Sequence, residues 1–232
     1  MTSKVLDKLI SYRFEMLLAG EIAILFGALV MPREIFDQIF SGLFFYLNLI
    51  AGGVLLISKK RYHHWFVAFF LILTGLIYGS ALFELFDGKS NSYFQMAITF
   101  VFYILVTFEI VMQVWSAKII NKTVIFGLIC GYITLGFIGF FICMSIEMAF
   151  PGSFEGLYNV NDPSNTLTER LMYYSYITML TIGYGEIIPI TSLAQKASIL
   201  IGLLGQFYLA IITASIVGKY INQTSRSQQD EG

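Results

Sequence analysis

Six long apolar segments set the first limit on what this chain can fold into. A helix that crosses a bilayer needs about 20 residues, within a range of about 17–25. The segments are residues 14–31, 42–57, 65–86, 93–115, 123–150 and 192–220. The chain is 57% hydrophobic and 12% charged, a composition that excludes an ordinary soluble domain. We therefore expect an all-α integral membrane protein with six transmembrane helices.

The basic residues indicate which loops face the cytoplasm. Lys and Arg in short loops remain on the cytoplasmic side of a membrane. With both termini inside, only four of the 14 basic residues fall outside, namely Arg33, Lys89, Arg170 and Lys196. We therefore expect a multi-pass protein of the plasma membrane with cytoplasmic N- and C-termini. The segment between the fifth and sixth helices is then extracellular.

A glycine-rich stretch, residues 178–186, lies in that extracellular segment and carries almost no charge. It reads TMLTIGYGE, in which Gly183 and Gly185 flank Tyr184. Glycine adopts backbone conformations that residues with a Cβ atom avoid. Irregular backbone at membrane depth persists only where it is buried in protein or lines a water-filled cavity. The stretch therefore predicts a pore.

The run Thr181-Ile182-Gly183-Tyr184-Gly185 resembles the selectivity filter of potassium channels, which usually has valine at the position of Ile182. In that family four such loops meet on one axis, and rings of carbonyl oxygens replace the hydration shell of K⁺. The resemblance implies a homotetramer in which residues 181 to 184 coordinate K⁺, with the Thr181 hydroxyl below the carbonyl rings. A motif this short also occurs in plain turns, but here a helix signal precedes it and an apolar segment follows.

A short helix is expected immediately before this filter. Thr166, with Glu169 three residues later, has the pattern of a capping box. The helix would end near Thr178, too short to span, so we expect it to enter the membrane and return. The partial negative charge of its C-terminal end would favour a cation in the pore. The resemblance gives filter-supporting roles to Gly185, Glu186, Thr178, Tyr173 and Tyr174.

Several positions depart from the usual pattern of that family. Tyr173 and Tyr174 stand where two tryptophans are usual, and Glu186 stands where aspartate is common. Leu180 replaces a common threonine, and Ile177 occupies a position that is glutamate in some members. These departures put the inactivation behaviour in doubt and leave K⁺ selectivity as the expectation.

The last apolar segment contains the candidate gate. Gly202 and Gly205 resemble the hinge of inner pore helices, because glycine weakens a helix locally. Packing of these glycines against the fifth helix is an equally good interpretation. Near the cytoplasmic end, a hydrophobic constriction can close a pore by dewetting. Its expected lining is Ala210, Ala214, Ile216, Val217 and Tyr220, with Ala214 and Val217 as gate residues.

The first four helices resemble a voltage sensor in layout alone. Residues 93–115 contain no Lys or Arg, and their one charged residue is Glu109. A sensor needs several spaced cations, each contributing about 2.3 kcal/mol per 100 mV, so we expect weak voltage dependence. Glu21 and Glu109 are candidate modulatory residues. Protonation, a crevice open to the cytoplasm, pairing with Lys59 or Lys60, and a neutral hydrogen bond are the alternatives for them.

These expectations divide the chain into four parts. They are a four-helix voltage-sensor-like domain without sensor charges (1–115), a cytoplasmic linker (116–122), a pore domain (123–220) and a cytoplasmic tail (221–232). The resemblance is to prokaryotic six-transmembrane potassium channels of the voltage-gated-like superfamily. It is specific over 116–220 and only topological before that.

Passive K⁺ conduction through a tetrameric pore is the expected function. A K⁺ transporter subunit and a non-channel membrane receptor built on the four-helix unit are the alternatives. No assembled group of His, Asp, Glu or Cys suggests an enzyme, and no organic cofactor or nucleic-acid partner is expected. Cys130 and Cys143 fall in one apolar segment and are expected to be small core residues. Membrane lipid is the further partner, and the sequence names no partner subunit.

Overall fold

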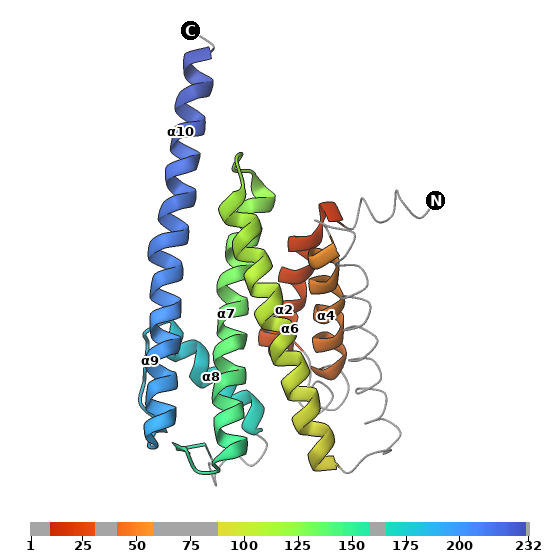
Figure 1. Cartoon of the computed structure of the whole chain (residues 1–232), viewed down its shortest axis with the longest axis vertical. Helices are drawn as coiled ribbons and strands as arrows, with labels where there is room; N and C mark the ends of the chain where they lie inside the picture. Colours follow the sequence, from red (N-terminus) through yellow and green to blue (C-terminus); the bar gives the residue numbers. More distant parts are fainter. Residues whose placement is uncertain (1–9, 31–40, 58–87, 158–165, 231–232) are drawn as a thin grey trace, which may run out of the picture. The chain divides into compact units, whose positions relative to one another are not determined.

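The computed structural model of the chain describes residues 10–30, 41–57, 88–157 and 166–230, and these are mostly helical (Figure 1). The helices are α2 (Arg13–Val30), α4 (Ser41–Ile57), α6 (Gly88–Ser116), α7 (Lys122–Ala149), α8 (Leu167–Met179), α9 (Ser192–Phe207), the π-helix η2 (Tyr208–Thr213) and α10 (Ala214–Asp230). Two short strands, β1 (Phe154–Glu155) and β2 (Ile188–Pro189), pair antiparallel.

Three of the described helical stretches are long and apolar enough to cross a membrane. They are Met96–Ser116, Lys122–Ala149 and Ser192–Ser225. This agrees with an all-α membrane protein. A fourth stretch, Leu43–Leu56 in α4, is apolar but shorter. The expected third span, residues 65–86, lies outside the described residues, so the number of six spans stays a prediction.

The chain forms two compact units and passes between them twice, once inside α7 and once inside α10. The first unit contains residues 1–131 and 223–232, and the second contains residues 132–222. The division into four functional parts that we expect from the sequence stays a prediction.

In the first unit, α2, α4 and α6 lie side by side (Figure 1). One buried amide, Asn48 on α4, joins all three. Its Nδ2 donates to the Leu17 carbonyl of α2 at 3.3 Å, and its Oδ1 accepts from the Tyr103 hydroxyl of α6 at 3.2 Å. A polar side chain in an apolar environment gains from such partners across helices, so Asn48 sets how the three helices pack.

Small residues let the helices of this unit approach closely. Gly52 on α4 faces Phe102 and Val106 of α6, whose atoms would lie 2.9 Å from a Cβ at that position. Gly127, in the first turns of α7, faces Phe14 and Val114 in the same way. A larger residue at either glycine would push the neighbouring helix away.

The second unit places α8 against α7 and α9. Tyr176 of α8 fits a notch at Gly136, where a Cβ atom would lie 2.2 Å from its ring, and its hydroxyl donates to the Ile133 carbonyl at 2.7 Å. Ser175 donates to the Gly136 carbonyl at 2.9 Å. Gly139 lies against Ile201 of α9. Gly136 and Gly139 therefore allow α8 and α9 to approach α7 closely.

The long final helix is interrupted by η2. A π-helix holds more residues per turn than an α-helix, is rare, and often marks a functional site. Tyr208, its first residue, is 5% exposed, and its ring lies 5.8 Å from that of Tyr132 on α7. Nothing in the sequence pattern predicts this irregularity, because no proline and no glycine falls within Tyr208–Thr213.

Candidate pore site

The short helix α8 begins as the sequence predicts. The Thr166 side chain accepts from the Glu169 N–H at 3.3 Å, and the Glu169 carboxylate accepts from the Thr166 N–H at 3.1 Å. This reciprocal pair confirms the capping box. At 13 residues and 1.5 Å of rise per residue, α8 is only about 20 Å long. It is too short to cross the hydrocarbon core, which is about 30 Å thick.

The backbone after α8 has an alternating conformation. Positive φ angles occur at every second residue, with 58° at Thr181, 55° at Gly183 and 90° at Gly185. Glycine adopts this conformation readily, whereas a β-branched threonine does so at a cost. Threonine at position 181 is therefore held in place by its surroundings.

Hydrogen bonds tie this segment to the end of α8. The N–H groups of Ile182 and Gly183 both point at the Ile177 carbonyl, at 2.8 and 3.3 Å, and the Thr181 N–H donates to the Thr178 carbonyl at 3.1 Å. Within the described residues, no hydrogen bond reaches the carbonyl oxygens of residues 181 to 184. The N–H groups of residues 181 to 183 therefore have partners in α8, whereas the carbonyl oxygens of residues 181 to 184 accept no hydrogen bond from the described residues.

The whole segment from Leu180 to Glu186 is exposed in the single chain, and the Tyr184 side chain is 75% exposed. Peptide carbonyls at membrane depth need a polar partner. A row of uncommitted carbonyl oxygens is suited to hard cations, which prefer oxygen ligands. These are the residues 181 to 184 at which the sequence analysis expects K⁺.

Tyr173 and Tyr174, the two candidate filter-supporting tyrosines of α8, make different contacts. Tyr174 is 4% exposed, and its hydroxyl lies 2.6 Å from the Ser198 hydroxyl of α9. Thr178 also hydrogen-bonds to Tyr174. The Tyr174 ring packs edge-on against Phe154 of β1, with centroids 5.2 Å apart. This side chain therefore joins α8 to α9 and to the turn after α7.

Tyr173 is exposed in the single chain, and its hydroxyl hydrogen-bonds to the Glu186 carboxylate. That bond, with smaller effects of partial burial and nearby charge, raises the pKa of Tyr173 to about 12, because the neutral hydroxyl is the donor. The two residues help to line a cavity of about 270 Å³. Of the candidate filter-supporting tyrosines, Tyr174 thus makes a buried contact with α9, and Tyr173 makes an exposed contact with Glu186.

One acidic residue of this site, Glu147 in the last turn of α7, was not expected from the sequence. Its side chain is 3% exposed, and its carboxylate accepts from the N–H groups of Gly152, Ser153 and Phe154 at 2.7, 2.9 and 3.3 Å. Charge-assisted bonds to backbone donors are stronger than neutral ones. A lone carboxylate one turn before the helix-ending Pro151 is the signal that could have identified it.

The turn held by Glu147 is connected to the segment after the filter. The Ile190 N–H donates to the Ser153 carbonyl at 2.9 Å, and β1 pairs with β2. Gly156, with φ of 84°, lies so close to the Glu186 carbonyl that a Cβ would sit 2.0 Å from its oxygen. The Arg170 guanidinium donates to the Gly156 carbonyl at 2.6 Å. The candidate filter segment is therefore followed by backbone that hydrogen bonds and close contacts hold in place.

The two candidate hinge glycines have different surroundings. Gly205 packs against the end of α8, since a Cβ there would lie 2.6 Å from Met179 Cγ and 2.7 Å from its carbonyl oxygen. Its close contact is with α8, and the fifth helix is instead approached at Gly139. Gly202 has nothing within 4 Å of its Cβ position. Bending at either glycine stays a prediction.

Four of the five expected gate-lining residues lie on the exposed side of the chain. These are Ala210, Ala214, Val217 and Tyr220. Ile216 is 4% exposed and is buried within the chain, so the expectation that it lines the axis with the others is wrong. On a helix, residues 216 and 217 point about 100° apart, which places them on different faces.

The two candidate modulatory carboxyls are in different environments. Glu21 is fully buried and hydrogen-bonds to the Cys130 thiol, which also lies 3.2 Å from the Phe14 carbonyl. Glu109 is half-buried and accepts from Gln113 Nε2 at 2.8 Å. Lys59 and Lys60, the expected alternative partners, lie outside the described residues. Both cysteines are buried, and neither forms a disulfide.

A family model of known proteins matches the part of the chain that contains this site. Residues 127–222, which contain most of α7, α8, the filter segment and the final helix, match a family described as "Ion channel". The match supports an ion channel. Comparisons with curated proteins and with solved structures gave no match. A channel transports ions across a membrane without catalysing a reaction, and the long apolar helices suit that setting.

Proposed function

We propose that the protein is a potassium-selective channel of the plasma membrane, in which four identical chains place residues 181 to 184 around one axis. One observation carries this proposal, namely an exposed backbone segment whose φ angles alternate in sign. The N–H groups of residues 181 to 183 are bound by the end of α8, and no described residue donates to the carbonyl oxygens of residues 181 to 184. A single chain offers these oxygens on one side of an ion. Four chains complete a ring.

A ring of carbonyl oxygens can select K⁺ because it replaces the hydration shell of that ion. Each K⁺ ion loses water on entry, and carbonyl oxygens from Thr181, Ile182, Gly183 and Tyr184 take the place of that water. The C-terminal end of α8 adds partial negative charge directly below the segment, which favours a cation. Several adjacent sites of similar affinity let ions displace one another along the row.

Exposed apolar side chains on the final helix support assembly into a homotetramer. Phe207, Ile211 and Val217 are each about half exposed in the single chain. In a membrane, such residues are covered by lipid or by a neighbouring chain, and the exposed filter segment beside them needs a protein neighbour. Both termini are proposed to be cytoplasmic, on the strength of the basic residues.

Selective flux into liposomes tests the proposal. Purified protein in phosphatidylcholine vesicles is expected to pass K⁺ in preference to Na⁺, and Ba²⁺, a divalent ion of similar size to K⁺, is expected to block. Gly183→Ser should abolish the preference, because serine at a positive φ distorts the carbonyl row. Absent or unselective flux in the unaltered protein would overturn the proposal.

Gly152→Ser is the matched control. Gly152 also has a positive φ, of 84°, and open space around its Cβ position, but it lies in the turn after α7. Both substitutions therefore introduce the same backbone strain, of about 1–3 kcal/mol. If the two variants lost selectivity equally, general destabilisation would explain the loss and the filter assignment would fail.

A further inference from the structure

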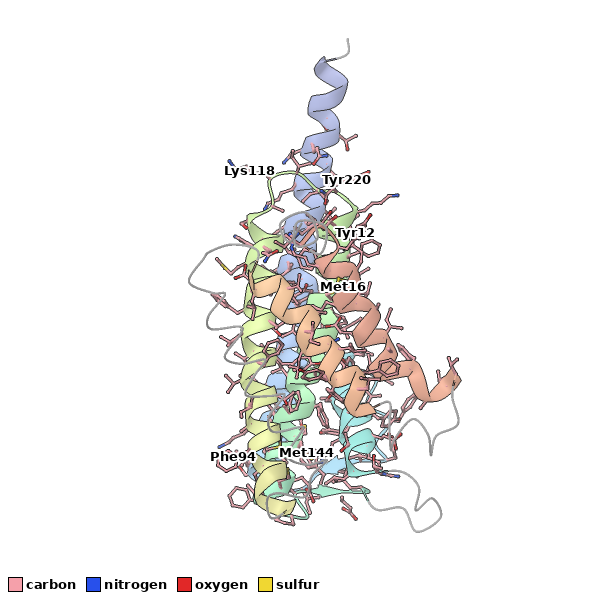
Figure 2. The ribbon with its side chains drawn as sticks, turned by 90° about the vertical axis from the view of Figure 1, so that its right-hand side faces the viewer. Tyr12, Met16, Phe94, Lys118, Met144 and Tyr220 are labelled. Carbon is pink, nitrogen blue, oxygen red and sulfur yellow. The ribbon has the colours of Figure 1, made fainter. Side chains whose placement is uncertain are left out.

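The first unit contains a cavity that the pore does not use. It has a volume of about 450 Å³ and lies between the start of α2, the end of α6 and the start of α7. Figure 2 shows Tyr12 and Lys118, which neighbour the cavity in sequence, at one end of this unit and Phe94 at the other. The cavity therefore lies at an end of the membrane-spanning helices, and helix ends are where lipid headgroups are expected.

Among the described residues that line this cavity, Arg13 is the charged one. Its Nε donates to Gln113 Oε1 at 2.8 Å, its Nη1 donates to the Ile10 carbonyl at 2.8 Å, and its guanidinium lies 4.7 Å from the centre of the Phe14 ring. These contacts hold the group in one orientation. A guanidinium has five N–H donors, so most of them remain available to a ligand.

The other polar lining residues are also hydrogen-bond donors. Ser11, Asn121 and Thr123 contribute hydroxyl and amide groups, and the first turn of α7 contributes its positive end. Lys118 and Lys122 lie close by in sequence and are exposed. Glu15 and Glu109 interact electrostatically with Arg13, but neither is among the described residues that line the cavity. The groups that a ligand would meet first favour an anion.

We propose that this cavity binds the phosphate headgroup of an anionic membrane phospholipid. Arginine matches phosphate oxygens with paired donors. Phe14, Val114 and Val124 make the remaining wall apolar, which suits the glycerol and upper acyl region of a lipid better than a free phosphate ion. Basic pockets between membrane helices recognise anionic headgroups in this manner. The proposal does not depend on which ion the pore passes.

Lipid binding to the full-length protein in detergent tests the proposal by native mass spectrometry. Phosphatidic acid and phosphatidylglycerol are titrated in parallel with phosphatidylcholine, and the anionic lipids are expected to bind more tightly. Arg13→Gln should weaken anionic-lipid binding by about tenfold or more, since a hydrogen bond to a charged group contributes about 1.5–3 kcal/mol. Lys118→Gln, the same loss of charge on an exposed neighbour, should change binding by less than about twofold.

Three outcomes would overturn the proposal. Equal weakening by Arg13→Gln and Lys118→Gln would mean general attraction to a basic surface. Displacement of the lipid by millimolar glycerol 3-phosphate or inorganic phosphate would assign the cavity to a soluble phosphate compound. Equal binding of phosphatidylcholine would remove the preference for anionic lipid.

A second variant covers the case in which Arg13→Gln does not fold. Thr123→Val keeps the shape of the side chain and removes one donor from the cavity wall. It is expected to weaken anionic-lipid binding by several-fold while the elution volume of the oligomer is unchanged. Unchanged lipid binding in this variant would count against the site. Because lipid binding is measured without flux, its result is independent of the K⁺ assay.

Discussion

At the scale of single residues, two departures from the usual potassium-channel pattern meet in one contact. Tyr173 stands where tryptophan is usual and Glu186 where aspartate is common, and the structure joins their side chains by a hydrogen bond. Considered separately in the sequence, each departure puts the inactivation behaviour in doubt. Taken together, a phenol donor and a longer carboxylate acceptor form a pair that bridges α8 and the segment after the filter.

This pair predicts a pH dependence at the alkaline end. The pKa of Tyr173 is raised from 10.0 to about 12, so its contribution to stability is complete below pH 10 and is lost as the pH rises to about 12. We expect the thermal stability of the wild-type oligomer to fall more steeply over this range than that of Tyr173→Phe. Tyr12→Phe, at a similarly exposed tyrosine, is the control and should behave like wild type.

Glu147 supports a second prediction at the residue scale. Its buried carboxylate serves three backbone N–H groups, whereas glutamine offers one oxygen and would place an amide donor against the others. Glu147→Gln should destabilise the folded chain by about 1.5–3 kcal/mol and reduce K⁺ over Na⁺ selectivity. Calorimetry and vesicle flux measure these two effects. Glu155→Gln, an exposed carboxyl on β1, should do neither, and equal effects of both would contradict the assignment.

At the scale of elements, the final helix illustrates why glycine positions alone do not locate an irregularity. Gly205 is engaged by Met179, while η2 begins three residues later with no glycine at all. A π-turn holds one residue more than an α-turn over the same length. We attribute the π-helix to two packing contacts that the final helix makes close together. Gly205 packs against the end of α8, and Tyr208 packs against Tyr132 of α7.

Deletion of one residue distinguishes η2 from the regular helix around it. Removing Leu209 should convert η2 to α-helix and leave the residues on both sides on their present faces. Removing Leu203 from α9 should rotate the neighbouring turns by about 100° and take Gly205 off Met179. We expect the first deletion to retain oligomer assembly by size-exclusion chromatography and K⁺ flux, and the second to lose both. If both deletions lost assembly and flux equally, η2 would not contain the extra residue that we assign to it.

At the scale of the whole molecule, the described helices of the first unit before α7, which are α2, α4 and α6, carry no row of basic residues of the kind that a voltage sensor needs. The one basic residue of α6 is Lys89, in its first turn. With so little charge to move, the open probability should vary weakly with voltage, because each transferred charge contributes only about 2.3 kcal/mol per 100 mV. Conductance measured against voltage in planar bilayers tests this. Steep activation carrying several charges per chain would contradict it.

Much of this protein could be predicted from its sequence because the signals are local. Long apolar segments specify membrane helices, and the capping pair Thr166 and Glu169 specifies the start of α8. The glycines at 183 and 185 specify a backbone with positive φ. Each of these depends on interactions between residues a few positions apart or with the solvent, so no knowledge of the tertiary arrangement is needed.

Only the tertiary structure decided the contacts between distant segments. The bonds of Asn48 to two helices, of Tyr173 to Glu186, and the inward position of Ile216 depend on which helix faces lie together. In a uniformly apolar helix, the sequence pattern does not show which face contacts protein and which contacts lipid, because both neighbours favour apolar residues. The positive φ at Thr181 has the same origin, since a threonine adopts it only where the end of α8 binds the neighbouring amides.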